Sequence, residues 1–535
     1  MSLNLRRAAG GAVLALVLGA LAPAAPGAAG TAPGSHGDRH RAPVAATQTG
    51  LVRGAAERGV DSFLGIPFAA PPVGDLRWAA PRPPARWRGV RDATEFGNRC
   101  PATESTNGPR SETEDCLFVI VQRPSDLRRG ERRPVFVFIH GGGLNNGSSN
   151  QMDMSKVVRE TGVVGVTMNY RLGVVGFLGL PDLTAEAGES GNYGFQDQQA
   201  SLRWVRRNVA AFGGDPSRVM LFGQSGGGAK IATMMAMPAA EGLFHRAATM
   251  SGQQVTASGP LNATARARAY LQALGVSTVD ALLALPAERL VEALGATDPI
   301  LGGGLYFGPV LDMKWLVRHP FWPDSPPQSN RIPMILGNTH DETRGFFGRD
   351  HPKIVGLDWS NLAERMAPEL RIDVQPEWVV AEYRRLFPQY TAEQIFFAAT
   401  TAGRSWRGQL EEAEARARAG TDTWVYQLDF ASPVEPWRGA PHTLDIPLVF
   451  GTLDAPGSIA GTGAESRRVS EAMMDAFIAF AASGNPNHRG LPDWPVYDLS
   501  ERRTMIFDRQ PHVENDPRRA ERELFGRVPY IQPGS

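Results

Sequence analysis

The chain of 535 residues is 42% hydrophobic, which is enough apolar material for a large buried core. Lysine and arginine together number 55, as do aspartate and glutamate, and no basic stripe is present, which argues against a nucleic-acid-binding protein. Two cysteines are too few for a cysteine-based metal site.

The N-terminal segment has the order of features found in an export signal. An arginine pair precedes an apolar run at residues 13–21, which is too short to span a bilayer, and small residues suited to cleavage follow it. We predict a signal peptide over residues 1–29 and secretion, by the general or the twin-arginine route, with an N-terminal membrane anchor as the alternative. Residues 30–44 predict a flexible linker. Residues 45–535 show no further linker and no membrane-spanning run, so we expect one large domain there.

The two cysteines, Cys100 and Cys116, enclose a short polar loop. In an exported protein they most simply form one disulfide, which would stabilise the fold by about 3 kcal/mol through the entropy of the unfolded loop. Two free thiols are the alternative.

Continuous apolar runs, the pattern of strands buried on both faces, occur early in this domain. The run at residues 135–139 ends directly in His140-Gly141-Gly142-Gly143. The run at residues 163–168 ends in Asn169-Tyr170-Arg171, and a shorter strand is expected at residues 118–121.

An amphipathic helix is predicted from near Asp197, because apolar residues recur at spacings of three and four until Gly213-Gly214. Another apolar strand, residues 219–222, follows at once. Strand, helix and strand joined by short turns form a βαβ unit, so we expect an α/β fold with a mostly parallel central sheet. In such sheets ligands bind beyond the carboxyl ends of the strands.

The second strand of this unit runs directly into Gly223-Gln224-Ser225-Gly226-Gly227. This is G-x-S-x-G in a strand–turn–helix context, the nucleophile elbow, where a sharp turn lifts a serine hydroxyl clear of the sheet. Because the chain contains 59 glycines, the motif alone also fits an inert serine in a glycine-rich turn. Ser225 is therefore a candidate nucleophile that needs partners.

The second half of the chain alternates helical and strand patterns. Residues 260–300 and 360–420 have helical composition and are expected to form insertions beside or above the sheet. Strands are predicted at residues 334–336 and 424–428, and a late helix is predicted from Ser470 to a stop at Gly484.

A serine nucleophile needs a base, and the base needs an acid that holds it. In folds with this elbow, the acid and then the base follow the serine along the chain. His442 lies in a loop soon after the 424–428 strand, where a base can reach the elbow. Asp341 and Glu342 directly follow the 334–336 strand, and spacing alone does not choose between them. Spacing also leaves open the other late histidines, which are His319, His340, His351, His488 and His512.

The same chemistry needs N–H donors for the charge that develops on the substrate oxygen. The glycines that follow His140 allow a close backbone approach at a strand end. Gly226, directly after the candidate nucleophile, offers a further N–H at a helix N-terminus, where the helix dipole also favours negative charge.

Further motifs accompany these features in the same chain. They are Gly65-Ile66-Pro67-Phe68-Ala69, Glu114-Asp115-Cys116-Leu117, Gly191-Asn192-Tyr193-Gly194, Ala211-Phe212-Gly213-Gly214-Asp215-Pro216 and Gly484-Asn485-Pro486-Asn487. Together with the glycine turn, the elbow, the Asp-Glu pair and His442, these motifs resemble the type-B carboxylesterase/cholinesterase family of α/β-hydrolases. The resemblance extends from about residue 47 to the C-terminus.

The resemblance implies an α/β-hydrolase fold, with helical insertions around an active-site gorge. It implies Ser225 as nucleophile, His442 as base and Glu342 as acid, and it needs no metal or cofactor. The implied oxyanion hole consists of Gly142, Gly143 and Gly226. Supporting features implied in the same way are the disulfide Cys100–Cys116, the ion pairs Arg77–Glu114 and Arg171–Asp197, and Ser251 beside the triad.

The chain also departs from the family pattern. Gln224 stands where the family usually has a glutamate, which removes a negative charge near His442 and favours slower turnover or a lower effective pKa of the base. Gly226 replaces the usual alanine, Leu144 a common aromatic residue and Ile120 a usual asparagine. The loop between the cysteines contains no tryptophan, so the cation–π contact that a choline ester needs is not expected.

We therefore expect a secreted serine carboxylesterase that acts on small-molecule esters. The alternatives are a lipase-type hydrolase with the same triad and, because some family members lose the triad, a non-catalytic binding or adhesion protein. A second Gly-Glu-Ser sequence, ending at Ser190, follows no apolar strand and is not expected to be the nucleophile.

Overall fold

The structure is a computed structural model that describes residues 42–181, 184, 188, 191–300 and 304–530. The predicted signal peptide, nearly all of the predicted linker and Ser190 lie outside the described residues. Residue contacts group Ala42–Ser535 into one compact unit.

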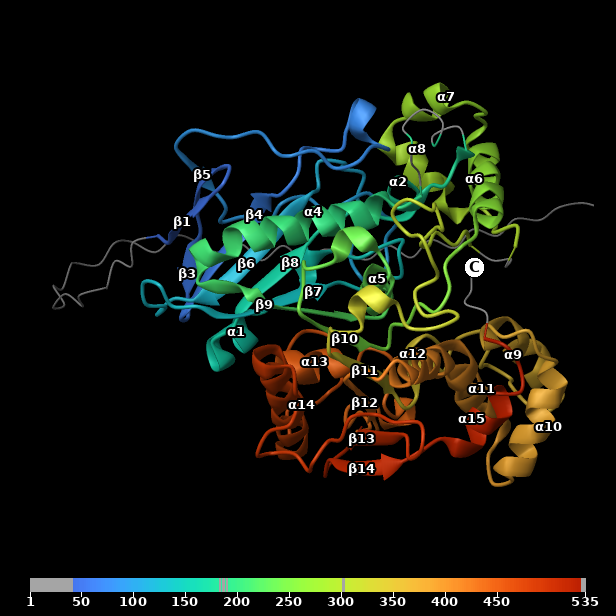
Figure 1. Cartoon of the computed structure of the whole chain (residues 1–535). Helices are drawn as coiled ribbons and strands as arrows, with labels where there is room; N and C mark the ends of the chain where they lie inside the picture. The colour runs from blue at the N-terminus through green and yellow to red at the C-terminus, as the bar shows by residue number, and fades with distance from the viewer. Residues whose placement is uncertain (1–41, 182–183, 185–187, 189–190, 301–303, 531–535) are drawn as a thin grey trace, which may run out of the picture. The chain divides into compact units, whose positions relative to one another are not determined.

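A central sheet of eleven strands runs through this unit, in the order β14-β13-β12-β11-β10-β9-β7-β8-β6-β4-β3 (Figure 1). Strands β8, β7, β9, β10, β11, β12 and β13, neighbours in that order, run parallel to one another. The strands beyond them at the two edges pair in antiparallel fashion. This confirms the predicted mostly parallel α/β sheet. The strands are β3 (Ala55–Glu57), β4 (Val60–Pro67), β6 (Phe118–Pro124), β7 (Arg133–Ile139), β8 (Val164–Met168), β9 (Gly214–Gln224), β10 (Arg246–Met250), β11 (Met334–Thr339), β12 (Thr423–Leu428), β13 (Arg503–Phe507) and β14 (His512–Asn515). A separate small sheet contains β1 (Val44–Thr47), β2 (Gly50–Arg53) and β5 (Val90–Asp92).

The continuous apolar runs are strands that are covered by helices on both faces. Along β7, Val135 and Val137 belong to one buried cluster, whereas Phe136 and Phe138 belong to another. This follows from the period of two along a strand, which sends successive side chains to opposite faces. The first cluster includes α4 (Tyr193–Asn208) and α5 (Gly226–Met235); the second includes α1 (Ser155–Thr161), α13 (Asp445–Phe450) and α14 (Ala464–Ser483).

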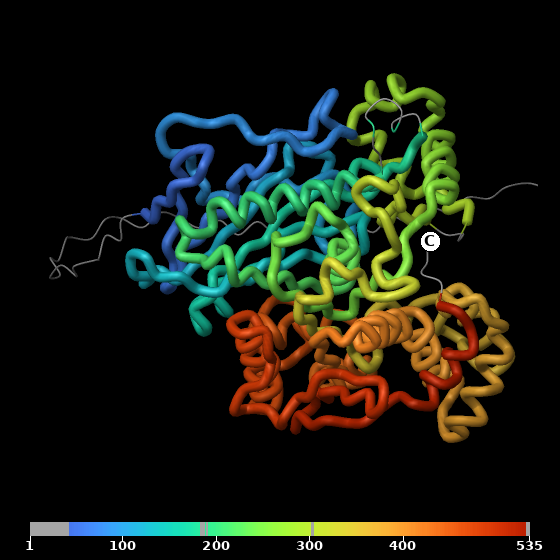
Figure 2. Tube along the Cα trace, viewed as in Figure 1, coloured from blue at the N-terminus to red at the C-terminus, as the bar shows by residue number. Residues whose placement is uncertain are grey.

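The two predicted helical insertions are present. They form two separate groups, yellow-green and orange in Figures 1 and 2. The first contains α6 (Pro260–Leu274), α7 (Val279–Leu283) and α8 (Ala287–Glu292); the second contains α9 (Leu362–Leu370), α10 (Pro376–Leu386), α11 (Ala392–Thr401), a π-helical turn (Ala402–Trp406) and α12 (Arg407–Arg418). Among the described helices, none has both the length and the apolar composition needed to cross a bilayer.

Two predicted helix starts were wrong. The helix predicted from near Asp197 begins at Tyr193, and the late helix predicted from Ser470 begins at Ala464. The first turns of α14 carry charged side chains that face solvent, so they lack the apolar periodicity on which the prediction rested.

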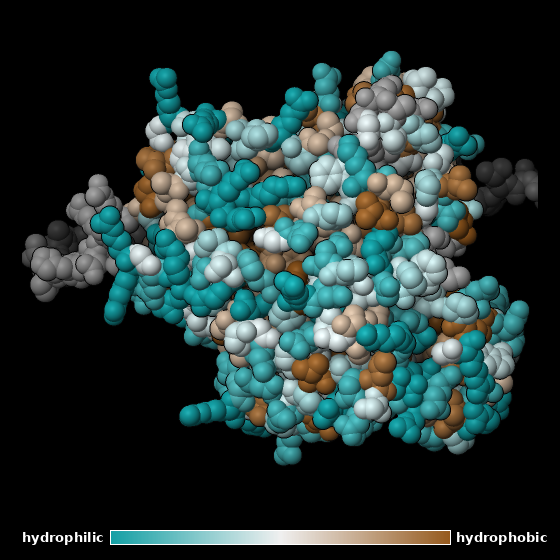
Figure 3. All heavy atoms as spheres, viewed as in Figure 1, coloured by the Kyte–Doolittle hydropathy of each residue, from teal (hydrophilic) through white to brown (hydrophobic). Residues whose placement is uncertain are grey.

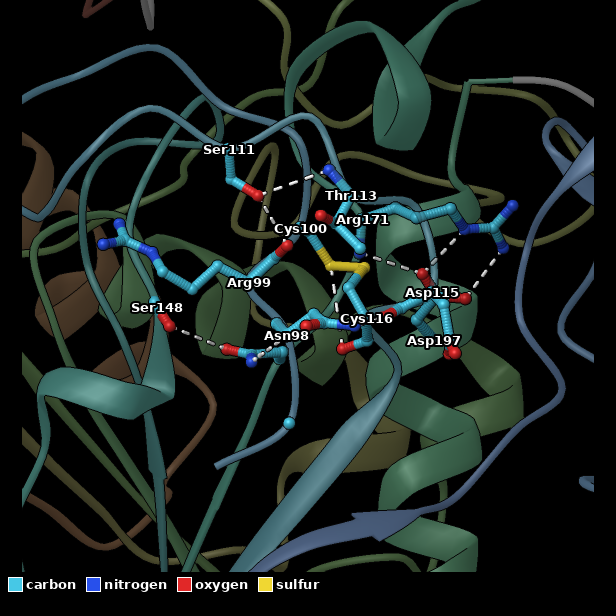
Figure 4. The surroundings of a disulfide bond; sticks show 12 residues. Asn98, Arg99, Cys100, Ser111, Thr113, Asp115, Cys116, Ser148, Arg171 and Asp197 are labelled. Carbon is cyan, nitrogen blue, oxygen red and sulfur yellow. Dashed lines mark hydrogen bonds and ion pairs between the residues drawn. A yellow bond between two sulfur atoms is a disulfide. The ribbon is translucent and has the colours of Figure 1, made fainter. Parts of the chain in front are cut away.

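The loop between the cysteines is held by a disulfide and by local hydrogen bonds (Figure 4). Cys100 and Cys116 are bonded to each other, with their Cα atoms 5.0 Å apart. Ser111 Oγ donates to the Arg99 carbonyl at 2.8 Å, and Asn98 Nδ2 donates to the Asp115 carbonyl at 3.0 Å. These bonds order a polar segment that has little apolar surface to bury.

Both ion pairs implied by the resemblance are present. Arg171 and Asp197 are fully buried and lie 2.7 Å apart, beside the disulfide in Figure 4. Arg77 and Glu114 lie 2.6 Å apart and are nearly buried. Because a buried charge that loses its partner is costly, each pair holds together the two chain segments that carry it.

Candidate active site

Ser225 occupies the sharp turn between β9 and α5. Its backbone has φ 57° and ψ −127°, outside the regions that non-glycine residues normally adopt. Such a conformation costs about 1–3 kcal/mol and persists only where the surroundings hold it. Here the Ser225 N–H donates to the Met250 carbonyl at 2.8 Å. Ser225 is partly exposed while its neighbours in the chain are buried, which is the arrangement of a nucleophile elbow.

Glycine at the start of α5 allows the oxyanion turn to lie directly against the helix. A Cβ atom at Gly226 would lie 2.0 Å from the Gly143 carbonyl oxygen, and one at Gly227 would lie 2.0 Å from the Ile139 carbonyl oxygen. Real Cβ atoms do not approach this closely, so a side chain at either position requires the turn to move. Glycine at position 226, where the family usually has alanine, therefore leaves room for the Gly143 carbonyl oxygen.

The carboxylate beside the imidazole is that of Glu342. Its Oε2 lies 2.5 Å from His442 Nδ1, and its Oε1 accepts hydrogen bonds from Asn338 Nδ2 at 3.0 Å and the Thr339 N–H at 2.9 Å. Burial raises the pKa of Glu342, but the His442 charge and the hydrogen bonds from His442, Ser251 and the Thr339 N–H outweigh this effect, so the pKa lies below its usual value. Glu342 is therefore an ionised group that accepts a hydrogen bond from Nδ1–H of His442.

Asp341, the other carboxylate left open by spacing, has different contacts. Its Oδ2 lies 3.2 Å from His340 Nδ1 and accepts the Ala440 N–H at 3.0 Å. It therefore anchors the loop that carries His442 without touching the imidazole in this arrangement. The remaining late histidines contact other groups: His319 accepts the Ala257 N–H, His351 the Lys353 N–H and His488 the Gly490 N–H, and His512 pairs with Glu514.

Gln224 hydrogen-bonds to the second nitrogen of the imidazole. Its Nε2 lies 3.1 Å from His442 Nε2, the nitrogen that faces the elbow. With Nδ1–H bonded to Glu342, His442 Nε2 is an acceptor, so the Gln224 amide donates to it. The Ser225 hydroxyl needs this same acceptor. Sequence reasoning noted the missing charge at position 224 but did not predict this hydrogen bond.

The glycine turn after β7 has left-handed backbone at Gly142, with φ 88°, and at Gly143, with φ 60°. Lys230, on α5, is fully buried and donates from Nζ to the carbonyl oxygens of Gly143 at 2.6 Å and His140 at 3.4 Å. Its ammonium also lies 5.0 Å from the centre of the Tyr170 ring. Burial lowers the pKa of Lys230 to about 7. At neutral pH about half of the Lys230 amines are therefore protonated, and this amine lies behind the turn that carries two of the implied oxyanion donors.

Lys230 was missed by sequence reasoning, although its signal was present. It is the one charged residue of α5, a helix of small and apolar side chains.

Asp445 was missed as well: its Oδ2 accepts the Tyr426 hydroxyl at 3.0 Å, and burial and the Glu342 charge raise its pKa to about 7. Ser251, implied as a supporting serine, helps to lower the pKa of Glu342.

The arrangement places a strained serine, an imidazole with an ionised carboxylate behind it, and a glycine turn at the carboxyl ends of β7, β9, β11 and β12. These are the parts that acyl transfer through a serine nucleophile requires. In the part of the chain that the structure describes, no group of histidine, cysteine, aspartate or glutamate side chains is placed to hold a metal ion.

Comparison with known proteins gives one consistent result. The model of the carboxylesterase family matches residues 41–525. The chain is 36% identical to para-nitrobenzyl esterase of Bacillus subtilis over 498 residues, 90% of this chain and 98% of the other. It is 34% identical to phenmedipham hydrolase of Pseudarthrobacter oxydans over 498 residues, 87% of this chain and 94% of the other. A solved carboxylesterase of Geobacillus stearothermophilus superposes with a TM-score of 0.80 at 36% identity, covering 90% of this chain and 99% of that one.

Proposed function

Because the chain belongs to the carboxylesterase family and is a carboxylic ester hydrolase, we propose that it works as a serine esterase in which Ser225, His442 and Glu342 form the triad. The observation that carries the proposal is the 2.5 Å contact between buried Glu342 and His442, on the loops beside the Ser225 elbow. The resemblance of the sequence to the carboxylesterase family implies the same three residues.

In the proposed reaction, the Ser225 oxygen attacks the ester carbonyl carbon while His442 Nε2 takes the hydroxyl proton. Negative charge forms on the carbonyl oxygen and is met by the N–H groups of Gly142, Gly143 and Gly226. The imidazolium then gives its proton to the leaving alkoxide, which departs as the alcohol. Water, activated by His442 in the same way, releases the acid and restores Ser225. Glu342 stays ionised and stabilises the imidazolium throughout.

Lys230 supports this mechanism from behind the turn. Its hydrogen bond to the Gly143 carbonyl holds the turn against α5, and its protonated form adds positive charge near the turn. No metal or cofactor takes part in any step of the proposed cycle.

For the substrate, we propose small-molecule carboxylic esters, in line with relatives named para-nitrobenzyl esterase and phenmedipham hydrolase. The test is kcat/KM for p-nitrophenyl esters from acetate to palmitate. A maximum at the short end of this series would support the carboxylesterase proposal. A maximum on the palmitate ester would instead identify a lipase-type hydrolase, and no hydrolysis of any ester by the folded protein would favour a binding role.

Replacing Gln224 with glutamate should raise kcat on short-chain esters by about three- to tenfold. The carboxylate cannot donate to His442 Nε2, so that nitrogen becomes free for Ser225, and a negative charge near the imidazolium stabilises the transition state by about 1 kcal/mol. Gln224→Met is the matched control, because it removes the donor without adding a charge. We expect this control to show a smaller increase, and a loss of activity in both variants would contradict the competition between Gln224 and Ser225.

We also propose that the protein is exported. The basic and apolar pattern at its N-terminus and the Cys100–Cys116 disulfide, a bond typical of oxidising compartments, support this proposal. N-terminal sequencing of the protein recovered outside the cytoplasm would test the predicted cleavage near residue 29.

A further inference from the structure

The loop between Cys100 and Cys116 is hydrogen-bonded to the segment that carries the glycine turn. The bond runs from Asn107 Nδ2 to Asn146 Oδ1, at 3.0 Å, and joins residues 39 positions apart. Both asparagines are half-buried. A loop that the disulfide closes is therefore attached to the chain beside the proposed oxyanion donors.

Asn146 lies directly against Gly142, one of these proposed donors. Its N–H donates to the Gly142 carbonyl oxygen at 3.1 Å and closes a turn over residues 142–146. A Cβ atom at Gly142 would lie 2.4 Å from the Asn146 carbonyl oxygen and 2.4 Å from Asn146 Oδ1. Gly142 also has φ 88°, which a residue with a side chain rarely adopts. The Asn146 side chain thus packs on the backbone whose N–H is to meet the oxyanion.

Local hydrogen bonds fix the backbone of Asn107. Its N–H donates to Ser105 Oγ at 3.1 Å, and its carbonyl oxygen accepts from Arg99 Nη2 at 3.0 Å. Ser105 and Gly108 exchange two backbone hydrogen bonds, at 3.0 and 2.9 Å, which form a tight turn around Asn107. In Figure 4 the Arg99 side chain extends away from the disulfide, to the same side of the view as Ser148, which follows the glycine turn. The Asn107 side chain is therefore aimed at Asn146 by the turn that carries it.

Residues 101–115 are polar, like most of the surface shown in Figure 3, and they offer little apolar area for burial. Hydrogen bonds therefore determine where this loop lies. Ordering a residue costs about 1–2 kcal/mol of backbone entropy, and the disulfide and the tight turn have already met this cost for Asn107. A bond made by such a preorganised side chain can hold its partner in place.

We infer that Asn107 is a positioning residue for ester hydrolysis, which holds Asn146 and thereby directs the Gly142 N–H at the substrate oxygen. The inference rests on the proposed oxyanion hole. Loss of one oxyanion donor lowers kcat by about 10²- to 10³-fold, and a displacement of about 1 Å can also be costly. Because Lys230 holds Gly143 from the α5 side, loss of Asn107 should misplace one donor and leave the rest of the turn in position.

The test is to measure kcat, KM and inhibition by butylboronic acid for Asn107→Ala and the wild type. Boron accepts the Ser225 oxygen while the hydroxyl proton passes to His442, which gives a tetrahedral anion that resembles the intermediate. We expect kcat to fall about tenfold, Ki to rise about tenfold and KM to change less than about twofold, because Asn107 acts where charge develops.

Two failures of this test have different meanings. A wild type that neither hydrolyses esters nor binds the boronate would refute the proposed mechanism, and the inference with it. A wild type that does both, with kcat and Ki unchanged in Asn107→Ala, would refute the inference alone.

Ser111→Ala is the matched control for a general loosening of the loop. The hydrogen bonds of Ser111 Oγ stay within residues 99–113, to the Arg99 carbonyl and the Thr113 N–H. We expect kcat of this variant to stay within about twofold of the wild type. A loss equal to that of Asn107→Ala would show that loop stability alone matters and would overturn the inference.

Asn146→Ala and the double variant with Asn107→Ala test the route of the effect. If Asn107 acts through Asn146, adding Asn107→Ala to Asn146→Ala should lower kcat by less than a further factor of about two. A further tenfold loss would mean that Asn107 acts by another route, which would contradict the inference.

Discussion

Ser225→Ala is expected to abolish ester hydrolysis, with kcat on p-nitrophenyl acetate falling by about 10⁵-fold or more. Without the hydroxyl no acyl-enzyme can form, and the remaining rate would come only from water positioned near the oxyanion donors. The measurement is steady-state kinetics with circular dichroism as a check of folding. Because alanine meets the same backbone strain as serine at φ 57°, we expect the variant to fold like the wild type.

A matched control exists in the same site. Ser251 also has a left-handed backbone, with φ 51°, and lies beside Glu342, but it is not at the elbow. Ser251→Ala should reduce kcat by no more than about tenfold, through the loss of one contact near the acid. More than about 1% residual activity in Ser225→Ala, or equal losses in both variants, would rule out Ser225 as the nucleophile. A trapped acyl group on the Ser225 peptide, seen by mass spectrometry, would support it directly.

Glu342→Gln should lower kcat by about 10⁴-fold with little change in KM. Glu342 Oε1 accepts from Asn338 and the Thr339 N–H, so a glutamine would keep its oxygen there and turn its NH₂ toward His442. The Nδ1 atom would then have to accept a hydrogen bond, which moves the imidazole proton to Nε2. That tautomer cannot take the Ser225 proton.

Asp341→Asn is the control for this prediction. It alters the neighbouring carboxylate, which holds the Ala440 N–H and not the imidazole, so kcat should fall by less than about tenfold. Comparable losses in the two variants would mean that the second carboxylate also acts on His442. Comparing kcat of Glu342→Gln with kcat of Asp341→Asn therefore shows which carboxylate acts on His442, a choice that spacing in the sequence left open.

Local patterns predicted most of the architecture. Strand β7, strand β9 and the elbow were predictable because apolar runs and glycine turns are local signals. The choice between Asp341 and Glu342 needed the family resemblance, since it depends on which carboxylate the loop at His442 approaches. The hydrogen bond from Gln224 to His442 joins residues 218 positions apart, and no local pattern reports such a contact. Lys230 is marked locally as the one charged residue of α5, but its partners, the carbonyl groups of His140 and Gly143, lie at the end of another strand and are not predictable from a local pattern.

The distribution of the site along the chain has a consequence for how the enzyme matures. Glu342 and His442 are 100 positions apart and join only when β11 and β12 have paired next to β10. Contacts between such distant segments are slow to form, because the entropy of closing long loops must be overcome first. If the proposed triad is correct, a nascent chain that ends before residue 442 carries the nucleophile Ser225 but not the base. Catalytic competence thus arises near the end of synthesis and folding, and the regain of activity after denaturation reports the completion of the sheet.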